Sequence, residues 1–161
     1  MDTIDLQIMS LIGENGRLSN REIARRLDIS EGTVRQRLGK MIESGMFRIT
    51  GQVNIETFPE LYIAFVGVKL DGRRLTECAT EINNLPSVLT TMIVTGRYDV
   101  FAVVLASSHK TLVDFVTNHL SHIHGVKDTE TFVVLRNYGQ WIPAHKLYQF
   151  MKNHDNPEEL I

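Results

Sequence analysis

The chain has 161 residues, of which 43% are hydrophobic, and a formal net charge of −2. This length allows one domain or two small ones with a buried core, and the near-neutral charge argues against a protein that coats nucleic acid. No apolar run approaches the ~20 residues of a membrane-spanning helix and no secretion signal is found, so we expect a cytoplasmic protein without a membrane partner. The single cysteine, Cys78, excludes an intrachain disulfide framework and a cysteine-cluster metal site.

Three short helices are predicted in the first 45 residues. The first runs from Asp2 to about Ile12 and has an apolar stripe formed by Ile4, Ile8, Leu11 and Ile12. Ser19, followed three residues later by Glu22, has the pattern of a capping box and begins the second helix. Ser30 can cap the third, which Gly45 ends. The inward positions of this third helix carry Val34, Leu38, Met41 and Ile42.

The second and third helices, joined by a tight turn, are typical of a helix-turn-helix that reads the major groove of double-stranded DNA. If Val34 points inward, helical geometry turns outward the side chains at Gly32, Gln36, Gly39, Lys40 and Glu43. Arg35 and Gln36 could bond base edges bidentately, and the Thr33 methyl could contact thymine. Phosphates suit Arg21, Arg25, Lys40 and the start of the second helix. The candidate DNA-binding residues are Asn20, Arg21, Arg25, Ser30, Glu31, Gly32, Thr33, Arg35, Gln36, Arg37 and Lys40.

The charge of this region supports the same interpretation. Between residues 15 and 40, seven basic side chains stand against three acidic ones, on a chain that is slightly acidic as a whole. A local basic patch suits a regulator with modest non-specific affinity for DNA. Two alternatives stay open: the helices could belong to some other bundle, and Arg37 could tie helices together instead of contacting a phosphate.

The second half alternates between strand and helix patterns in the order β-α-β-β-α-β. The predicted elements are a strand Tyr62–Leu70, a helix from Arg73 to about Asn83, strands Val88–Thr95 and Val100–Ala106, a helix with Leu112, Phe115, Val116, His119, Leu120 and Ile123 inward, and a strand Thr129–Leu135. This order predicts an α+β chain whose second part is a ferredoxin-like αβ-sandwich. Residues 46–55 could form a wing or a strand that links the two parts. The uncovered sheet face requires either a tail helix near Ala144–Lys152 or a second copy of the chain.

From Ile4 to about Leu135 the sequence resembles the leucine-responsive/asparagine-responsive regulator (Lrp/AsnC) family. The residues that carry the resemblance are Asp5, Asn15-Gly16-Arg17-Leu18-Ser19, Ile29-Ser30, Arg37-Leu38, Gly45, Gly96-Arg97-Tyr98-Asp99, Gly125-Val126, Thr129 and Thr131. The resemblance implies a winged helix-turn-helix domain with its linker strand over residues 1–57, and a ligand-sensing, oligomerising domain over 58–161. It also implies homodimers that assemble into tetramers or octamers, and a small effector, usually an amino acid, bound between subunits.

The turn Gly96–Asp99 is the candidate effector site. It offers backbone at Gly96, the guanidinium of Arg97 and the carboxylate of Asp99, which could bind the two charged groups of an amino acid. By resemblance, the turn lies near three residues of a neighbouring subunit. The candidate residues are Gly96, Arg97, Tyr98, Asp99, Asp128, Thr129 and Thr131. The alternative is a plain β-turn, which Gly and Asp favour for backbone reasons.

No motif of an enzyme is present, and we expect no metal and no cofactor. His119, His122 and His124 lie close together in the sequence, but no cysteine completes a zinc site, and His119 falls on the predicted apolar face. Two alternative functions stay open: a repurposed family member that acts as an enzyme, similar to tetrapyrrole decarboxylases, and a metabolite-binding module without DNA binding.

Overall fold

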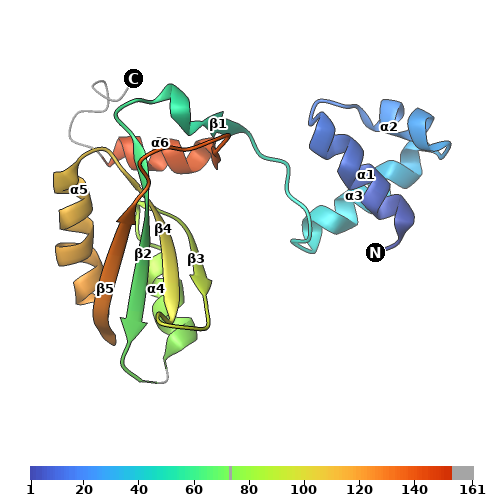
Figure 1. Cartoon of the computed structure of the whole chain (residues 1–161). Coiled ribbons are helices and arrows are strands. Elements are labelled where there is room, and N and C mark those ends of the chain that lie inside the picture. The colour runs from blue at the N-terminus through green and yellow to red at the C-terminus, as the bar shows by residue number, and fades with distance from the viewer. Residues whose placement is uncertain (73, 154–161) are drawn as a thin grey trace. The chain divides into compact units, whose positions relative to one another are not determined.

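The computed structural model describes residues 1–72 and 74–153 (Figure 1). The chain divides into two units, Met1–Thr50 and Gly51–Ile161. This division falls before residue 57, the predicted end of the first domain, because the residues after Thr50 pair and pack within the second unit. Arg73, the predicted start of a helix, and the end of the second domain at residue 161 lie outside the described residues.

The first unit consists of three helices, α1 (Thr3–Glu14), α2 (Asn20–Leu27) and α3 (Glu31–Glu43). Their shared core is apolar and comprises Ile8, Ile12, Ile23, Ala24, Val34 and Met41. One inward residue was predicted wrongly: the side chain of Ile42 is 45% exposed. At 100° per residue Ile42 lies about 80° away from Val34, at the edge of the buried stripe, whereas Met41 lies within about 20° of it.

Within residues 46–55 only Gln52–Asn54 form a strand, and this strand pairs within the second unit instead of forming a wing on the helical unit. Within residues 1–50, all of which the structure describes, there is no strand. β1 (Gln52–Asn54) pairs antiparallel with β6 (Trp141–Pro143), a strand that the sequence did not predict, and a 3₁₀ turn over Ile55–Thr57 follows. The C-terminal segment therefore holds the chain directly after it leaves the helical unit.

The second unit has the predicted β-α-β-β-α-β order. Its elements are β2 (Tyr62–Leu70), α4 (Leu75–Asn83), β3 (Val88–Ile93), β4 (Val100–Ala106), α5 (His109–Asp114) and β5 (Val126–Val133). The strands form one antiparallel sheet in the order β3-β4-β2-β5. The last strand begins earlier than predicted because Val126 and Asp128, opposite Leu70 and Lys69, already belong to the ladder with β2, and it ends earlier because Val133, opposite Ala64, is the last paired residue.

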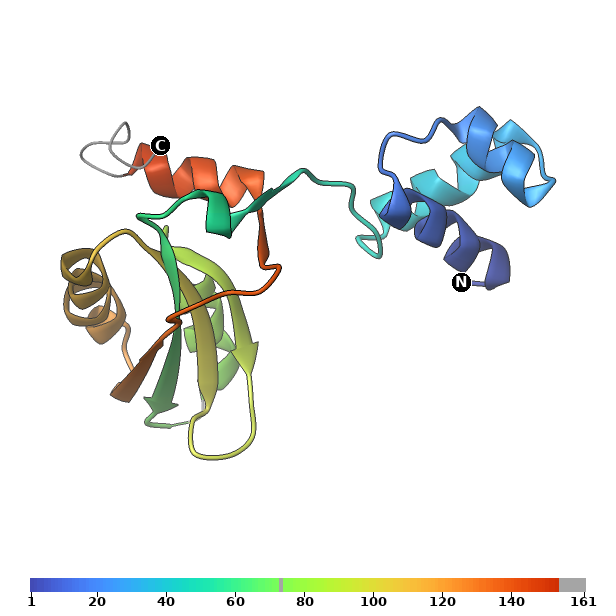
Figure 2. The ribbon, with the colours of Figure 1, turned by 45° about the horizontal axis from the view of Figure 1, so that its top comes forward.

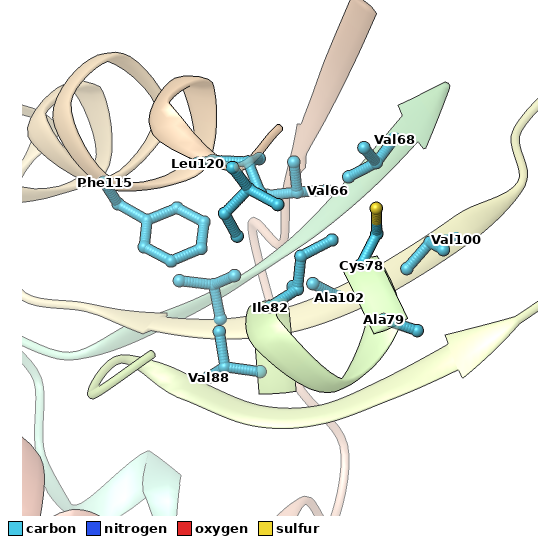
Figure 3. Packing of buried hydrophobic residues seen from close by; sticks show 12 residues of the cluster. Val66, Val68, Cys78, Ala79, Ile82, Val88, Val100, Ala102, Phe115 and Leu120 are labelled. Carbon is cyan, nitrogen blue, oxygen red and sulfur yellow. The ribbon is translucent and has the colours of Figure 1, made fainter. Parts of the chain in front are cut away.

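One face of this sheet is covered by α4 and by the segment that begins with α5. Alternating residues of β2 and β4, such as Val66 and Ala102, point toward Ile82 and Cys78 of α4 and toward Phe115 (Figure 3). Cys78 is a buried core residue whose thiol donates to the carbonyl of His124 across 3.3 Å.

The helix predicted through residues 112–123 is irregular. After α5 the chain makes a π-helical turn over Phe115–His119 and a 3₁₀ turn over Leu120–His122. The wider π turn changes the phase, so that Phe115 and Leu120 are buried, while the side chain of His119 is 45% exposed. The placement of His119 on the apolar face was therefore wrong.

The opposite sheet face is only partly covered. The tail helix α6 (Ala144–Lys152) lies at one end of the sheet (Figure 2), where Leu147 and Phe150 pack with Ile63 and Leu105. Farther along the same face, three large apolar side chains are exposed by 40 to 46%, namely Phe65, Met92 and Phe132. The protomer thus leaves an apolar surface on its sheet.

Candidate functional sites

The tight turn between α2 and α3 is built by two caps and one left-handed residue. The hydroxyl of Ser19 accepts from the backbone N–H of Glu22 (3.2 Å), and that of Ser30 accepts from the N–H of Thr33 (3.0 Å). Asp28 adopts φ 53°, which ends α2 and lets the N–H of Ile29 donate to the carbonyl of Ala24.

The reciprocal half of the predicted capping box is not formed at α2. The carboxylate of Glu22 binds Arg25 through contacts of 2.7 and 3.2 Å and Arg26 through one of 3.1 Å, instead of reaching back to Ser19. These bonds to Arg25 and then Arg26 lower the pKa of Glu22 to about 2, and the bond from Glu22 raises the pKa of Arg25. A charged donor makes the stronger hydrogen bond, which explains why Glu22 turns toward the arginines.

The outer face of α3 carries exposed polar side chains, as predicted. Arg35, Gln36 and Lys40 are exposed, while Val34 and Met41, on the other side of the helix, are buried. The exposed residues on the first turn are Glu31 and Gly32, and the half-buried Thr33 shares a 2.8 Å hydrogen bond with the hydroxyl of Ser30. Arg35 donates to Glu31 across 2.8 Å on the surface. On α2, Arg21 is exposed and Asn20 is half-buried.

Arg37 lies on the other side of α3 and holds α1. Its guanidinium donates to Asp2 (2.7 Å) and to Asp5 (2.9 Å), and its side chain is 29% exposed. The same two carboxylates cap α1: Asp2 accepts from the N–H groups of Ile4 and Asp5, and Asp5 accepts from the N–H of Asp2. Of the two interpretations left open, the observed contacts are those of a residue that ties helices together.

Charge pairing at this junction favours both carboxylates in their ionised form. The pKa of Asp2 is lowered, first by the hydrogen bond from Arg37, and the pKa of Asp5 is lowered, first by the backbone N–H of Asp2 and then by Arg37. The capping role of Asp2 and Asp5 was not predicted. Its signal was present, since an acidic residue three positions before a second one, ahead of an apolar stripe, has the spacing of a cap.

The Gly96–Asp99 turn is anchored to strand β2. Gly96 adopts φ 130°, which favours glycine. One oxygen of Asp99 accepts from the backbone N–H of Leu70 (2.8 Å), and the N–H of Asp99 donates to the carbonyl of Val68 (3.0 Å). The carboxylate therefore has a structural task besides any role toward a ligand.

Tyr98 packs flat on the sheet at Gly67 and is only 7% exposed. A Cβ atom at Gly67 would lie 2.8 Å from the tyrosine ring, so only glycine leaves room for it. Arg97 is exposed and lies 3.6 Å from the carboxylate of Glu130 on β5, a residue that was not among the predicted ones. Because this contact depends on the order of strands in space, the local sequence gives no signal for it.

The remaining candidate effector residues lie on β5, an edge strand of the sheet. Thr129 and Thr131 stand opposite Val68 and Val66, and Asp128 accepts from the N–H of Thr129 across 2.9 Å. Within the protomer, β2 and β4 stand in order between β5 and β3. Across residues 1–72 and 74–153, no group of three or more His, Cys, Asp and Glu side chains is placed to hold a metal ion.

The comparisons with known proteins agree with this architecture. Residues 1–48 match the family model for a winged helix-turn-helix DNA-binding domain, and residues 63–140 match that for the Lrp/AsnC ligand-binding domain. The HTH-type transcriptional regulator PH0140 of Pyrococcus horikoshii is 32% identical over 136 residues, which cover 83% of this chain and 85% of that protein. The regulator Ptr1 of Methanocaldococcus jannaschii is 29% identical, covering 86% and 94%.

Two solved structures are similar over almost their whole length. AsnC of E. coli has a TM-score of 0.70 at 25% identity, covering 85% of this chain and 93% of that one. The regulator NMB0573 of Neisseria meningitidis, solved in complex with L-Met, has a TM-score of 0.71 at 25% identity, covering 91% and 99%.

Fold, domain matches and relatives together define a DNA-binding transcriptional regulator with a ligand-binding domain. The chain belongs to the Lrp/AsnC family. None of its helices, over the part of the chain that the structure describes, is long and apolar enough to cross a membrane.

Proposed function

We propose that the chain regulates transcription by placing α3 in the major groove of double-stranded DNA. The observation that carries this proposal is the exposed pair Arg35 and Gln36 beside the cap that Ser30 provides. Their side chains can form bidentate bonds with base edges. We assign the reading of bases to Glu31, Thr33, Arg35 and Gln36, close approach to the groove to Gly32, and contacts with phosphates to Asn20, Arg21, Arg25, Ser30 and Lys40.

Some of these contacts require an exchange of partners. Arg25 is bound to Glu22 and Arg35 to Glu31, each on the surface of the protein. Exposed ion pairs contribute little to stability, so a phosphate or a base edge can replace the carboxylate at small cost. Arg37 differs, because its partners also cap α1, and we infer that it supports the position of α3 instead of contacting DNA.

The active form is proposed to be at least a homodimer. Phe65, Met92 and Phe132 form an exposed apolar surface on the sheet, and a second copy would bury it. A twofold dimer also supplies two copies of α3, which suits operators with two half-sites one helical turn apart. Higher oligomers follow if further surfaces of the second unit associate.

We propose an amino acid as the effector, bound between subunits. Gly96, Arg97, Tyr98 and Asp99 of one subunit and Asp128, Thr129 and Thr131 of a neighbour would form the site. The exposed guanidinium of Arg97 suits a carboxylate, and Asp99 suits an ammonium group. The similarity to NMB0573, a relative solved with L-Met, supports this class of ligand. For regulation, the effector must bind one assembly geometry more tightly than another.

Fluorescence anisotropy with a labelled duplex from the chain's own promoter tests the DNA proposal. Binding should weaken steeply as salt rises, because each phosphate contact contributes a logarithmic slope of about −0.9. A metabolite-binding module or an enzyme without DNA affinity would show no retention of the duplex at low salt, which would refute the proposal.

Sedimentation with Asp99→Asn tests the effector site. An amide oxygen can still accept from the N–H of Leu70, so the variant keeps the structural bond and loses only the charge. An amino acid that shifts the sedimentation of the wild type should not shift that of Asp99→Asn. An equal shift in both proteins would remove Asp99 from the site.

A further inference from the structure

The second unit contains a cavity at the end of the sheet away from the Gly96–Asp99 turn. It has a volume of about 450 Å³ and lies between the segment after α4, the helix α5 and the end of α6. Its lining residues include Ser87, Lys110, Asp114, Phe115, His119 and Phe150. Strand β4 (Val100–Ala106) separates the turn from this end, and seven extended residues span roughly 24 Å. The DNA-binding surface and the candidate effector turn do not use this cavity.

Two opposite charges of α5 line the cavity without neutralising each other. Lys110 and Asp114 stand four residues apart, a spacing at which side chains on a helix usually meet. Among the described residues, 1–72 and 74–153, the side chain of Lys110 has no ion pair or hydrogen bond, and Asp114 accepts from Asn118 across 2.5 Å. His119 lies 3.9 Å from the carboxylate of Asp114. The cavity therefore offers one ammonium group that has no ion pair among the described residues, and one carboxylate.

Two aromatic residues border the cavity and are almost completely buried. Phe115, in the π turn after α5, is 2% exposed, and Phe150, in α6, is 6% exposed. That turn also moves His119 out of the core to the cavity wall. Single π-helical turns are rare and occur often at functional sites.

We propose that this cavity binds a small zwitterion, an α-amino acid with an apolar side chain. Lys110 would bind the carboxylate and Asp114 the ammonium group, and the side chain would lie over Phe115 and Phe150, whose nearly buried rings offer it a small contact area. The charged groups of the wall balance, which disfavours multiply charged anions such as phosphates. The volume lies within the ~300–1,000 Å³ of typical small-molecule pockets.

Occupancy of the cavity would act on the connection to the DNA-binding unit. One wall belongs to α6, which follows β6 directly, and β6 pairs with β1, the strand that begins just after the boundary at Thr50. A ligand that fixes α6 would thus bias the linking strand. This consequence rests on the proposed function, whereas binding itself does not.

Isothermal titration calorimetry of the full chain with each of the twenty L-amino acids tests the site. For an amino acid that binds in the cavity, Lys110→Gln and Asp114→Asn should each weaken the affinity of the cavity about tenfold or more, since each removes one charged hydrogen bond. The affinity of the Gly96–Asp99 turn should not change. Two analogues of this amino acid, the amine without the carboxylate and the carboxylic acid without the amino group, should bind the wild type about as weakly as the amino acid binds the two variants. Lys69→Gln and Glu81→Gln, which remove the same charges elsewhere on the unit, should leave the affinity unchanged.

Asp99→Asn separates this site from the proposed effector turn. If amino-acid binding is lost in Asp99→Asn but kept in Lys110→Gln, the cavity proposal is overturned and the effector turn stands. Binding by none of the twenty amino acids, or equal binding by the deaminated analogue, would also overturn it. Because the side chain of Lys110 has no hydrogen bond or ion pair within residues 1–72 and 74–153, Lys110→Gln should fold like the wild type, and circular dichroism checks this.

Discussion

Individual side chains of the helical unit divide into those that build it and those that face outward. Arg37 and Arg35 stand two positions apart on α3, yet Arg37 bonds Asp2 and Asp5 of α1, while Arg35 bonds only its own helix at Glu31. Two arginines of the same sequence region thus have different tasks. The difference is set by the side of α3 on which each one lies.

Arg37→Ala should lower the melting temperature and weaken binding to all duplexes equally. The change leaves Asp2 and Asp5 without their cation, so α3 loses its tie to α1. Arg35→Ala should keep the melting temperature and lose base preference at one position. Arg37→Lys should restore part of the melting temperature, because a lysine keeps the charge but lacks the planar fork. Differential scanning calorimetry and duplex competition check these expectations. Loss of base preference in Arg37→Ala with an unchanged melting temperature would contradict them.

The pH dependence of stability should change in Glu22→Gln. The pKa of Glu22 falls from 4.5 to about 2 on folding, so its contribution to stability is fully present above about pH 4.5 and is lost as the pH falls toward 2. Removing the carboxylate should flatten the decline of the unfolding free energy in that window. Urea denaturation at a series of pH values measures this, with Glu14→Gln as a control on an exposed glutamate. A slope equal to that of the wild type would be the contrary result.

Among the elements, helix α3 contains two glycines, Gly32 and Gly39. We expect replacement of Gly39 to change the stability of the unit and replacement of Gly32 to change its affinity for DNA. A Cβ atom at Gly32 would meet only the hydroxyl oxygen of Ser30, at 3.7 Å, and one at Gly39 would meet nothing within 4 Å. Neither glycine is therefore required for packing within its unit. Glycine in a helix interior costs about 1 kcal/mol relative to alanine. For Gly32, on the first turn of α3, we propose that close approach to DNA offsets the lower helix propensity.

Gly39→Ala should stabilise the unit by up to about 1 kcal/mol and leave DNA affinity unchanged. Gly32→Ala should fold equally well but bind DNA more weakly, because its methyl group would hold the first turn of α3 away from the groove. Thermal unfolding and anisotropy on the same samples distinguish the two glycines. Undiminished affinity in Gly32→Ala would show that close approach at this position is not needed.

The elements of this chain were predictable where their pattern is local. β2, β4 and α6 were predicted with their observed bounds, because alternation and helical spacing are carried by consecutive residues. β6 could not be predicted, since three residues become a strand only by pairing with β1. The π turn after α5 was missed because helical spacing was taken as regular. A step of five between Phe115 and Leu120 was its one signal.

The candidate sites, like the elements, were predictable where the signal lies in consecutive residues. The exposed face of α3 followed from helical spacing, and the Gly96–Asp99 turn from its composition. The contacts of Arg97 with Glu130 and of Asp99 with Leu70 depend on neighbours far away in the sequence. They are set by the order of strands in the sheet, which no local pattern contains.

At the scale of the whole molecule, the exposed sheet surface should decide assembly. Phe65→Asp places a charge in the centre of that surface, and burying a charge without a partner is costly, so the dimer should dissociate. Val113→Asp is the matched control, since Val113 on α5 is 44% exposed but lies outside this surface. Analytical ultracentrifugation should show a smaller species only for Phe65→Asp. A dimer that survives this substitution would place the interface elsewhere.

The central claim is that the outer face of α3 recognises base pairs, and selection of duplexes from a random library at fixed salt tests it most directly. The wild type should enrich a motif with twofold symmetry, and Gln36→Ala should lose preference at one base pair of each half-site, at a cost of roughly 1–3 kcal/mol. The motif should be otherwise unchanged, because the phosphate contacts remain. Enrichment of the same motif to the same degree by Gln36→Ala and by Arg35→Ala would contradict the claim.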